Sequence, residues 1–270
     1  MSTVDKTIPW LAGSRPNPAA ELRLFCFPYA GGGALTYRYW SKHLPAQVEV
    51  CAVQLPGRGS RLREPPFTQM EPLVKAILRE LRSYLDMPFA FFGHSMGAII
   101  SFELARLLRR EHAALPVHLY VSGRSAPQLS KPRTPTYGLA NAEFMEELLR
   151  LKGTPPEVLN HPGLMQVVMP LLRADFELIE TYTYMHEPPL SIPLTAFGGL
   201  ADLETSRESL DAWRAQTTAE FSLRMLPGDH FYLTSNEEPL LSVLARELYS
   251  DQLRKREDVQ HQAAVPRLLF

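Results

Sequence analysis

Short runs of consecutive apolar residues recur along the chain, and longer segments with apolar positions every three or four residues lie between them. Strands that are covered on both faces of a parallel sheet show such unbroken apolar runs. Six runs fit this pattern, at residues 22–28, 48–55, 89–93, 117–123, 192–198 and 221–227. We predict that these six segments are strands.

The segments between the runs have the period of amphipathic helices, at residues 70–85, 96–110, 205–216 and 238–253. Alternating strands and helices are typical of an α/β fold, in which helices flank a mostly parallel central sheet. We predict that residues 21–125 and 190–250 form this core. An N-terminal extension (1–20) precedes it, and a flexible C-terminal tail (251–270) follows.

One connection interrupts the alternation. Residues 126–189 contain no strand-like run, but they contain two helical patterns, at 141–151 and 163–185, joined by proline-rich segments. A long insertion between two strands is expected to form a helical lid over one edge of the sheet, where binding loops lie. Its methionines Met145, Met165 and Met169 are more often core residues than ligand contacts. Met side chains nevertheless suit the wall of a binding site, because they repack easily around different shapes.

Composition and charge exclude several classes of protein. The 270 residues carry 28 Lys and Arg against 29 Asp and Glu, which leaves no basic excess for nucleic-acid binding. No apolar run is long enough to span a membrane, and the first twenty residues lack a secretory pattern, so we expect a cytoplasmic monomer. Cys26 and Cys51 lie in strand-like runs and are expected to be buried thiols. No zinc-binding spacing is present, and we expect neither metal nor cofactor.

A candidate nucleophile follows the third predicted strand. Residues 93–97 read GHSMG, a G-x-S-x-G sequence between a predicted strand and a predicted helix. In that setting a tight strand-to-helix turn lifts the serine oxygen out of the sheet edge. We predict Ser95 as the nucleophile. The similar GRSAP at 123–127 lacks the second glycine, so Ser125 is predicted to be a loop residue.

A serine needs a base to accept its proton and a third group to orient that base. Among eight histidines, His230 alone follows the last predicted strand, at the edge where ligands bind in open α/β sheets. His94, fixed in the turn beside Ser95, is expected to point elsewhere. We therefore predict His230 as the base.

The acid is expected between serine and histidine in the chain, as in α/β-hydrolases. Asp202 follows the predicted strand at 192–198 and fits this order. Asp175 is the alternative, although a helix of a movable lid is a poor support for an imidazole. Asp229 is adjacent to His230 and is predicted to be a turn residue.

Acyl transfer also requires donors for the developing oxyanion. We predict the backbone N–H of Met96, directly after the nucleophile, and that of Ala30, in the YAGGG loop (29–33) after the first predicted strand. The glycines of this loop lack the G-K-[ST] of a phosphate-binding loop and do not match G-x-G-x-x-G, so no nucleotide site is expected.

Four segments together resemble the type II thioesterases of nonribosomal peptide and polyketide synthesis. They read FPYAGG (27–32), QLPGRGSR (54–61), GHSMG (93–97) and PGDHF (227–231). The second has no catalytic role that its residues reveal and is interpreted as a rigid turn. Two details depart from the family: Asp229 stands where glycine is common, and the loop at 199–203 lacks the usual proline or acidic neighbour.

The resemblance implies an α/β-hydrolase fold and hydrolysis of acyl or aminoacyl thioesters from the 4′-phosphopantetheine arm of acyl or peptidyl carrier proteins. Such enzymes clear stalled or wrongly primed carriers. Three alternatives stay open: a carboxylesterase or lipase with the same triad, a medium-chain fatty-acyl thioesterase, and a non-catalytic carrier-binding module with a relic triad.

Overall fold

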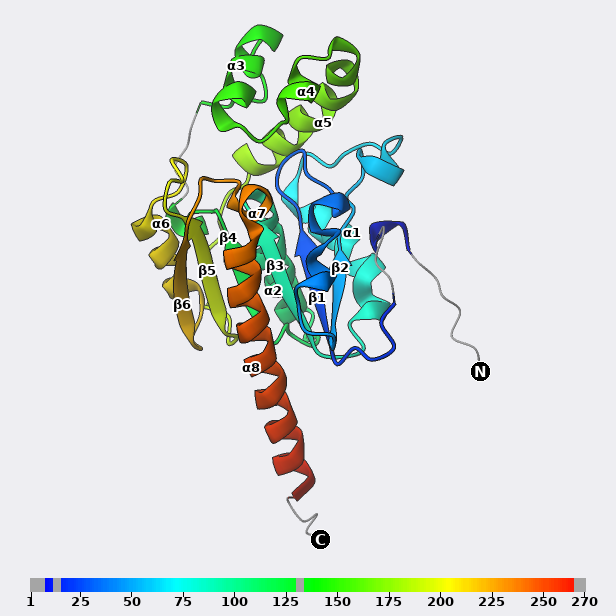
Figure 1. Ribbon diagram of the computed structural model, residues 1–270, viewed down its shortest axis with the longest axis vertical. Helices are drawn as coiled ribbons and strands as arrows, with labels where there is room; N and C mark the ends of the chain where they lie inside the picture. Colours follow the sequence, from blue (N-terminus) through cyan, green and yellow to red (C-terminus); the bar gives the residue numbers. More distant parts are fainter. Residues whose placement is uncertain (1–7, 12–15, 130–133, 265–270) are drawn as a thin grey trace.

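The computed structural model describes residues 8–11, 16–129 and 134–264 (Figure 1). Its centre is one six-stranded sheet in the order β2-β1-β3-β4-β5-β6, and all five strand pairings are parallel. The strands are β1 (Leu22–Phe27), β2 (Val48–Ala52), β3 (Phe89–His94), β4 (Leu119–Ser122), β5 (Leu194–Gly199) and β6 (Phe221–Leu226). Each lies within or almost within a predicted run, so the predicted α/β fold is confirmed.

Helices connect the strands and make up the insertion. The α-helices are α1 (Met70–Leu81), α2 (Met96–Arg110), α3 (Asn141–Leu151), α4 (Pro156–Leu159), α5 (Pro162–Glu180), α6 (Arg207–Asp211), α7 (Tyr232–Ser235) and α8 (Glu237–Ala264). The 3-10 helices are η1 (Pro9–Leu11), η2 (Ala34–Tyr37), η3 (Trp40–Lys42), η4 (Gly59–Arg61), η5 (Arg82–Tyr84), η6 (Pro127–Leu129) and η7 (Ala212–Gln216). The short helix α4 was not predicted, and α8 continues past the predicted end at residue 253 into the segment expected to be a flexible tail.

Alternate residues of each strand point to opposite faces of the sheet, so the sheet has two cores. Phe91 packs on the face covered by α1, α2 and η7, and its neighbour Phe92 packs on the face covered by η2, η3, α7 and α8. Cys51 belongs to the first core and Cys26 to the second, and both are free and buried, as predicted. The N-terminal extension also contributes, because Trp10 is buried in the first core.

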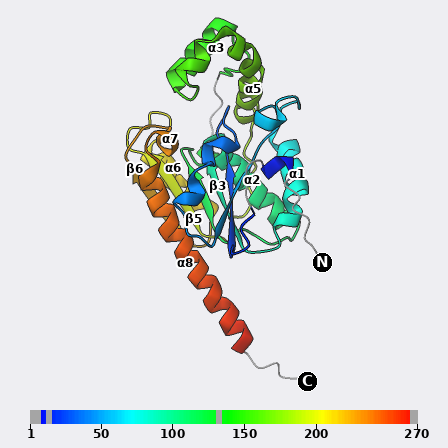
Figure 2. The ribbon, with the colours of Figure 1, turned by 45° about the vertical axis from the view of Figure 1, so that its right-hand side comes forward.

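The insertion stands over one end of the sheet. Helices α3, α4 and α5 lie together beyond the carboxyl ends of the strands, and α5 reaches down toward β1 and α1 (Figures 1 and 2). The insertion has a small apolar core of its own, formed by Phe144, Leu148, Leu159, Met165 and Leu172. This placement sets its helices above the loops that carry the candidate site.

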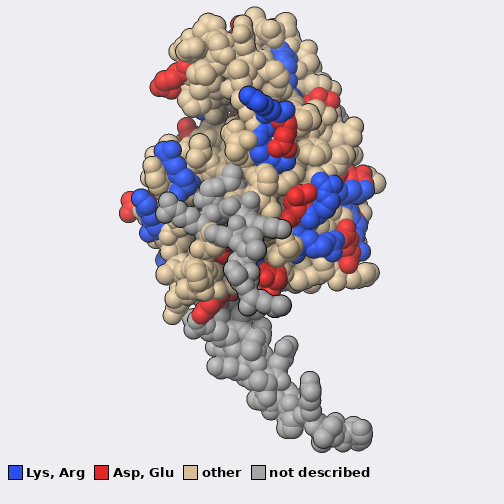
Figure 3. Space-filling view, turned by 90° about the vertical axis from the view of Figure 1, so that its right-hand side faces the viewer, with Lys and Arg blue, Asp and Glu red and all other residues tan. Residues whose placement is uncertain are grey.

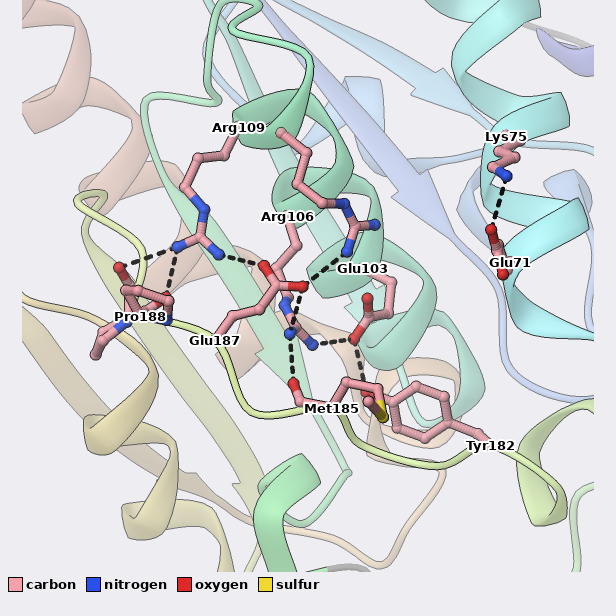
Figure 4. A network of polar contacts seen from close by, with 11 residues as sticks. Glu71, Lys75, Glu103, Arg106, Arg109, Tyr182, Met185, Glu187 and Pro188 are labelled. Atoms are coloured by element: carbon pink, nitrogen blue, oxygen red, sulfur yellow. Dashed lines mark hydrogen bonds and ion pairs between the residues drawn. The ribbon is translucent and has the colours of Figure 1, made fainter.

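Arginines of α2 hold the segment that returns from the insertion to β5 (Figure 4). Arg106, whose side chain is 2% exposed, pairs with Glu103 at 2.6 Å and with Glu187 at 2.8 Å. Glu187 also pairs with Arg109 and Arg110, and the Tyr182 hydroxyl donates to Glu103 at 2.7 Å. The return segment is therefore fixed to the helix that begins directly after Ser95.

Charges of both signs are interspersed on the described part of the face in Figure 3, in line with the net charge of −1. Within the described ranges, every helix is too short or too polar to cross a membrane. The same residues contain no cluster of His, Cys, Asp and Glu that could hold a metal ion.

Candidate active site

Ser95 occupies a strained turn between β3 and α2. Its φ is +53°, a left-handed value that is uncommon for a residue other than glycine. The two glycines of the motif are required by close backbone approach: a Cβ on Gly93 would lie 2.1 Å from the Gly97 carbonyl oxygen, and one on Gly97 would lie 2.1 Å from that of Phe27. The turn thus presses α2 against the end of β1 and leaves Ser95 at the wall of a cavity.

His230 and Asp202 form a hydrogen-bonded pair beside this turn. His230 follows β6 and Asp202 follows β5, so both stand at the carboxyl end of the sheet with Ser95. The distance from His230 Nδ1 to Asp202 Oδ2 is 2.8 Å, and His230 lines the same cavity as Ser95. The structure therefore brings the three predicted residues to one site.

The Asp202 carboxylate is held by its own loop. Oδ1 accepts a hydrogen bond from the Glu204 amide at 2.8 Å, and Oδ2 accepts one from the Thr205 hydroxyl at 2.6 Å. Burial raises the pKa of Asp202, but the hydrogen bond to His230, the charge of that imidazole and the hydrogen bonds from Thr205 and Glu204 together outweigh burial and hold the pKa below its ordinary value. Asp202 is thus an oriented, ionised acceptor for the imidazole.

His94 lies beneath His230 and does not compete with it as the base. The two ring centroids are 5.1 Å apart, and His94 Nδ1 is 2.8 Å from Ser122 Oγ, which in turn shares a hydrogen bond with the Tyr232 hydroxyl. Burial, followed by repulsion from His230, lowers the pKa of His94 well below its ordinary value. His94 is therefore a neutral, buried residue, and its hydrogen bond goes to Ser122.

The two predicted oxyanion donors also lie at this cavity. Met96 is the first residue of α2, where a backbone N–H has no acceptor within its helix. Ala30 is part of a turn closed by a hydrogen bond from the Gly32 amide to the Tyr29 carbonyl at 2.9 Å. No hydrogen bond of the described residues uses the Ala30 amide. Both groups are available to a ligand oxygen.

The cavity has a volume of about 430 Å³, within the range of small-molecule sites. Apolar residues of the insertion form much of its wall, and they are Leu129, Leu148, Leu151, Leu172, Phe176 and Ile179. Met145, Met165 and Met169 do not line the cavity, and among the described lining residues Met96 is the one methionine. Met165 instead belongs to the small core of the insertion, and Met145 and Met169 pack against that core, which is the role their type most often has.

The alternative acid, Asp175, lies elsewhere. It is buried on α5 and forms a bidentate ion pair with Arg58, which belongs to the segment interpreted as a rigid turn. Ser125 is a loop residue, as predicted, and hydrogen-bonds Ser209 at 3.0 Å. Asp229 is a turn residue, as predicted, because its Oδ1 accepts from the Phe231 amide at 3.0 Å.

Sequence reasoning missed the partners behind the triad. Thr205 and Tyr232 carry no motif, and their roles depend on loops that meet only in the folded chain. For Arg58 the sequence did offer a signal. An arginine between two glycines, in a segment with no evident chemical role, can indicate a buried arginine that pairs with an acidic residue.

Comparisons with known proteins decide the family. Residues 22–248 match the model of the thioesterase domain. The chain belongs to the thioesterase domain family. It is therefore a thioester hydrolase with the α/β-hydrolase fold.

Several proteins similar to this thioesterase are named for biosynthetic pathways. The gramicidin S biosynthesis protein GrsT of Aneurinibacillus migulanus is 44% identical over 248 residues, which cover 92% of this chain and 97% of the relative. RedJ, a thioesterase from the prodiginine biosynthetic pathway in Streptomyces coelicolor, superposes with a TM-score of 0.80 at 42% identity, covering 86% of this chain and 87% of RedJ. BorB, the type II thioesterase from the borrelidin biosynthetic cluster, gives 0.79 at 35% identity, with coverages of 87% and 95%.

Proposed function

We propose that this thioesterase hydrolyses acyl and aminoacyl thioesters from the phosphopantetheine arm of carrier proteins, clearing stalled or wrongly primed carriers in polyketide or nonribosomal peptide synthesis. The observation that carries the proposal is the Asp202–His230 pair beside Ser95 in one cavity of a thioesterase-family chain. The biosynthetic settings of RedJ and BorB support the choice of substrate.

In the first half of the reaction, His230 takes the proton of Ser95 while the serine oxygen bonds to the thioester carbonyl carbon. Asp202 orients the imidazole and stabilises its positive charge. The carbonyl oxygen becomes an oxyanion, which the amides of Ala30 and Met96 stabilise. The C–S bond then breaks, and the thiol leaves with the proton from His230.

Water completes the reaction. His230 removes a proton from water, the resulting oxygen attacks the acyl-Ser95 ester, and the carboxylic acid leaves as Ser95 recovers its proton. The apolar wall supplied by the insertion, which we propose acts as a lid, suits an acyl group or the thin pantetheine arm. A monomeric, cytoplasmic enzyme remains our prediction.

The carrier is tested by one acyl group on three thiols: a carrier protein, coenzyme A and a truncated pantetheine thiol. We expect kcat/KM to fall in that order, because binding energy from remote parts of the substrate can lower the barrier at the reacting carbon. Equal values would remove the carrier from the proposal and leave a generic acyl thioesterase. Faster turnover of nitrophenyl oxyesters than of any thioester would favour a carboxylesterase.

A further inference from the structure

A buried ion pair joins the insertion to the loop that carries Ala30. Arg58 Nη1 and Nη2 each lie 2.7 Å from one carboxylate oxygen of Asp175, and the two side chains are 6% and 2% exposed. Asp175 is on α5, whereas Arg58 follows β2. Removing two charges from water is costly, so such a pair is a poor source of stability and calls for another explanation.

Two atoms of this ion pair, Asp175 Oδ2 and Arg58 Nη1, also hold the oxyanion loop (residues 29–33). Asp175 Oδ2 accepts a hydrogen bond from the Gly31 amide at 2.7 Å, and Arg58 Nη1 donates one to the Gly32 carbonyl at 3.0 Å. Both backbone groups belong to the turn that contains Ala30. The ion pair thus binds the turn through two backbone groups, the Gly31 N–H and the Gly32 carbonyl.

The hydrogen bond from Gly31 to Asp175 fixes the orientation of the central peptide of the turn. In a β-turn starting at Tyr29, the peptide between Ala30 and Gly31 is the central one, and the two common turn types differ by a flip of that peptide. Gly31 has φ +78°, the value for the third position of a type II turn. Asp175 accepts from the N–H of this peptide and therefore selects one orientation.

We propose that Asp175 and Arg58 are positioning residues, which fix the oxyanion loop so that the insertion helix α5 holds the turn that carries the Ala30 amide. The inference rests on the proposed role of Ser95 and the oxyanion donors. Neither side chain lines the cavity that contains Ser95. Their effect falls on the transition state, where the oxyanion forms, and little on binding of the thioester.

The test uses Arg58→Lys, which keeps a cation beside Asp175 but loses the two-pronged contact, and Asp175→Asn. Acyl-coenzyme A is the substrate, so the result does not depend on a carrier protein. We expect kcat to fall about 10- to 100-fold with KM within about twofold, because a misplaced oxyanion donor acts mainly on the transition state. The inhibition constant of a trifluoromethyl ketone, which forms a tetrahedral oxyanion on serine, should rise with the loss in kcat/KM.

Arg173→Gln is the matched control. Arg173 is on the same helix but contacts the Tyr137 carbonyl and Asn141, inside the insertion. The Arg173→Gln enzyme should keep the kcat of the parent. Gly31→Ala distorts the turn but leaves both charges in place, and it should lower kcat as Arg58→Lys does. This variant keeps the test valid even if Asp175→Asn fails to fold.

The inference would be overturned if folded Arg58→Lys and Gly31→Ala enzymes had the same kcat as the parent. It would also be overturned if kcat fell while the inhibition constant of the ketone stayed unchanged, or if Arg173→Gln lost as much kcat as Arg58→Lys. Failure of the proposed function is distinguishable, because the parent enzyme itself would then not hydrolyse the thioester.

Discussion

The Asp202 carboxylate is oriented by its own loop as well as by the imidazole. The Glu204 amide donates to Oδ1, and the Thr205 hydroxyl donates to Oδ2, the oxygen that also contacts His230. A free carboxylate would rotate and sample several hydrogen bonds, whereas this one presents Oδ2 to Nδ1. The tautomer of His230 that leaves Nε2 free to accept a proton is thereby favoured.

Asp202→Asn is expected to lower kcat about 10²- to 10⁴-fold, because an amide at this position can donate to Nδ1 and favour the wrong tautomer. Steady-state hydrolysis of an acyl-coenzyme A, with circular dichroism to verify folding, measures the effect. Asp229→Asn is the control, since asparagine can still accept from the Phe231 amide. Similar losses in both variants would contradict the assignment of the acid.

Helix α2 has two roles at its two ends. Its first turn carries the Met96 amide beside Ser95, and its last turns hold the segment returning from the insertion through Arg106 and Glu187 (Figure 4). The helix that begins directly after Ser95 therefore also binds the segment that leaves the insertion, and this links the position of the insertion to that of Ser95.

Glu187→Ala should lower the free energy of unfolding by about 1–3 kcal/mol, because the buried Arg106 cation loses one of its carboxylate partners. Chemical denaturation measures the change. Glu71→Ala removes the exposed ion pair with Lys75 and should leave stability unchanged. Equal denaturation midpoints for the two variants would show that the arginine network does not stabilise the fold.

The elements that could be predicted are those with a local signal. The unbroken apolar runs identified all six strands, and the period of 3.6 gave α2 and α3 their observed ends. Helix α4 was missed because four residues between prolines show no period. The predicted end of α8 was too early because the segment after residue 253 loses its apolar repeat while the helix continues.

At the scale of the whole molecule, the prediction of the site relied on the topology of the sheet. Parallel strands end at one edge, so residues after β3, β5 and β6 could be expected to meet, and Ser95, Asp202 and His230 do. Contacts between distant loops could not be predicted this way. Asp175 and Arg58 are 117 positions apart, and no period or motif relates a helix of the insertion to a turn after β2.

The most direct test of the account is thiol release from an acyl-coenzyme A by the parent enzyme and by Ser95→Ala, with Ser125→Ala as a control from the same cavity. The account predicts that Ser95→Ala loses more than about 10³-fold in kcat and is not labelled by a fluorophosphonate, because both the thioester and the probe are attacked by the Ser95 oxygen. Ser125→Ala should keep its labelling and most of its turnover. A folded Ser95→Ala enzyme that releases thiol at a rate near that of the parent would contradict the account.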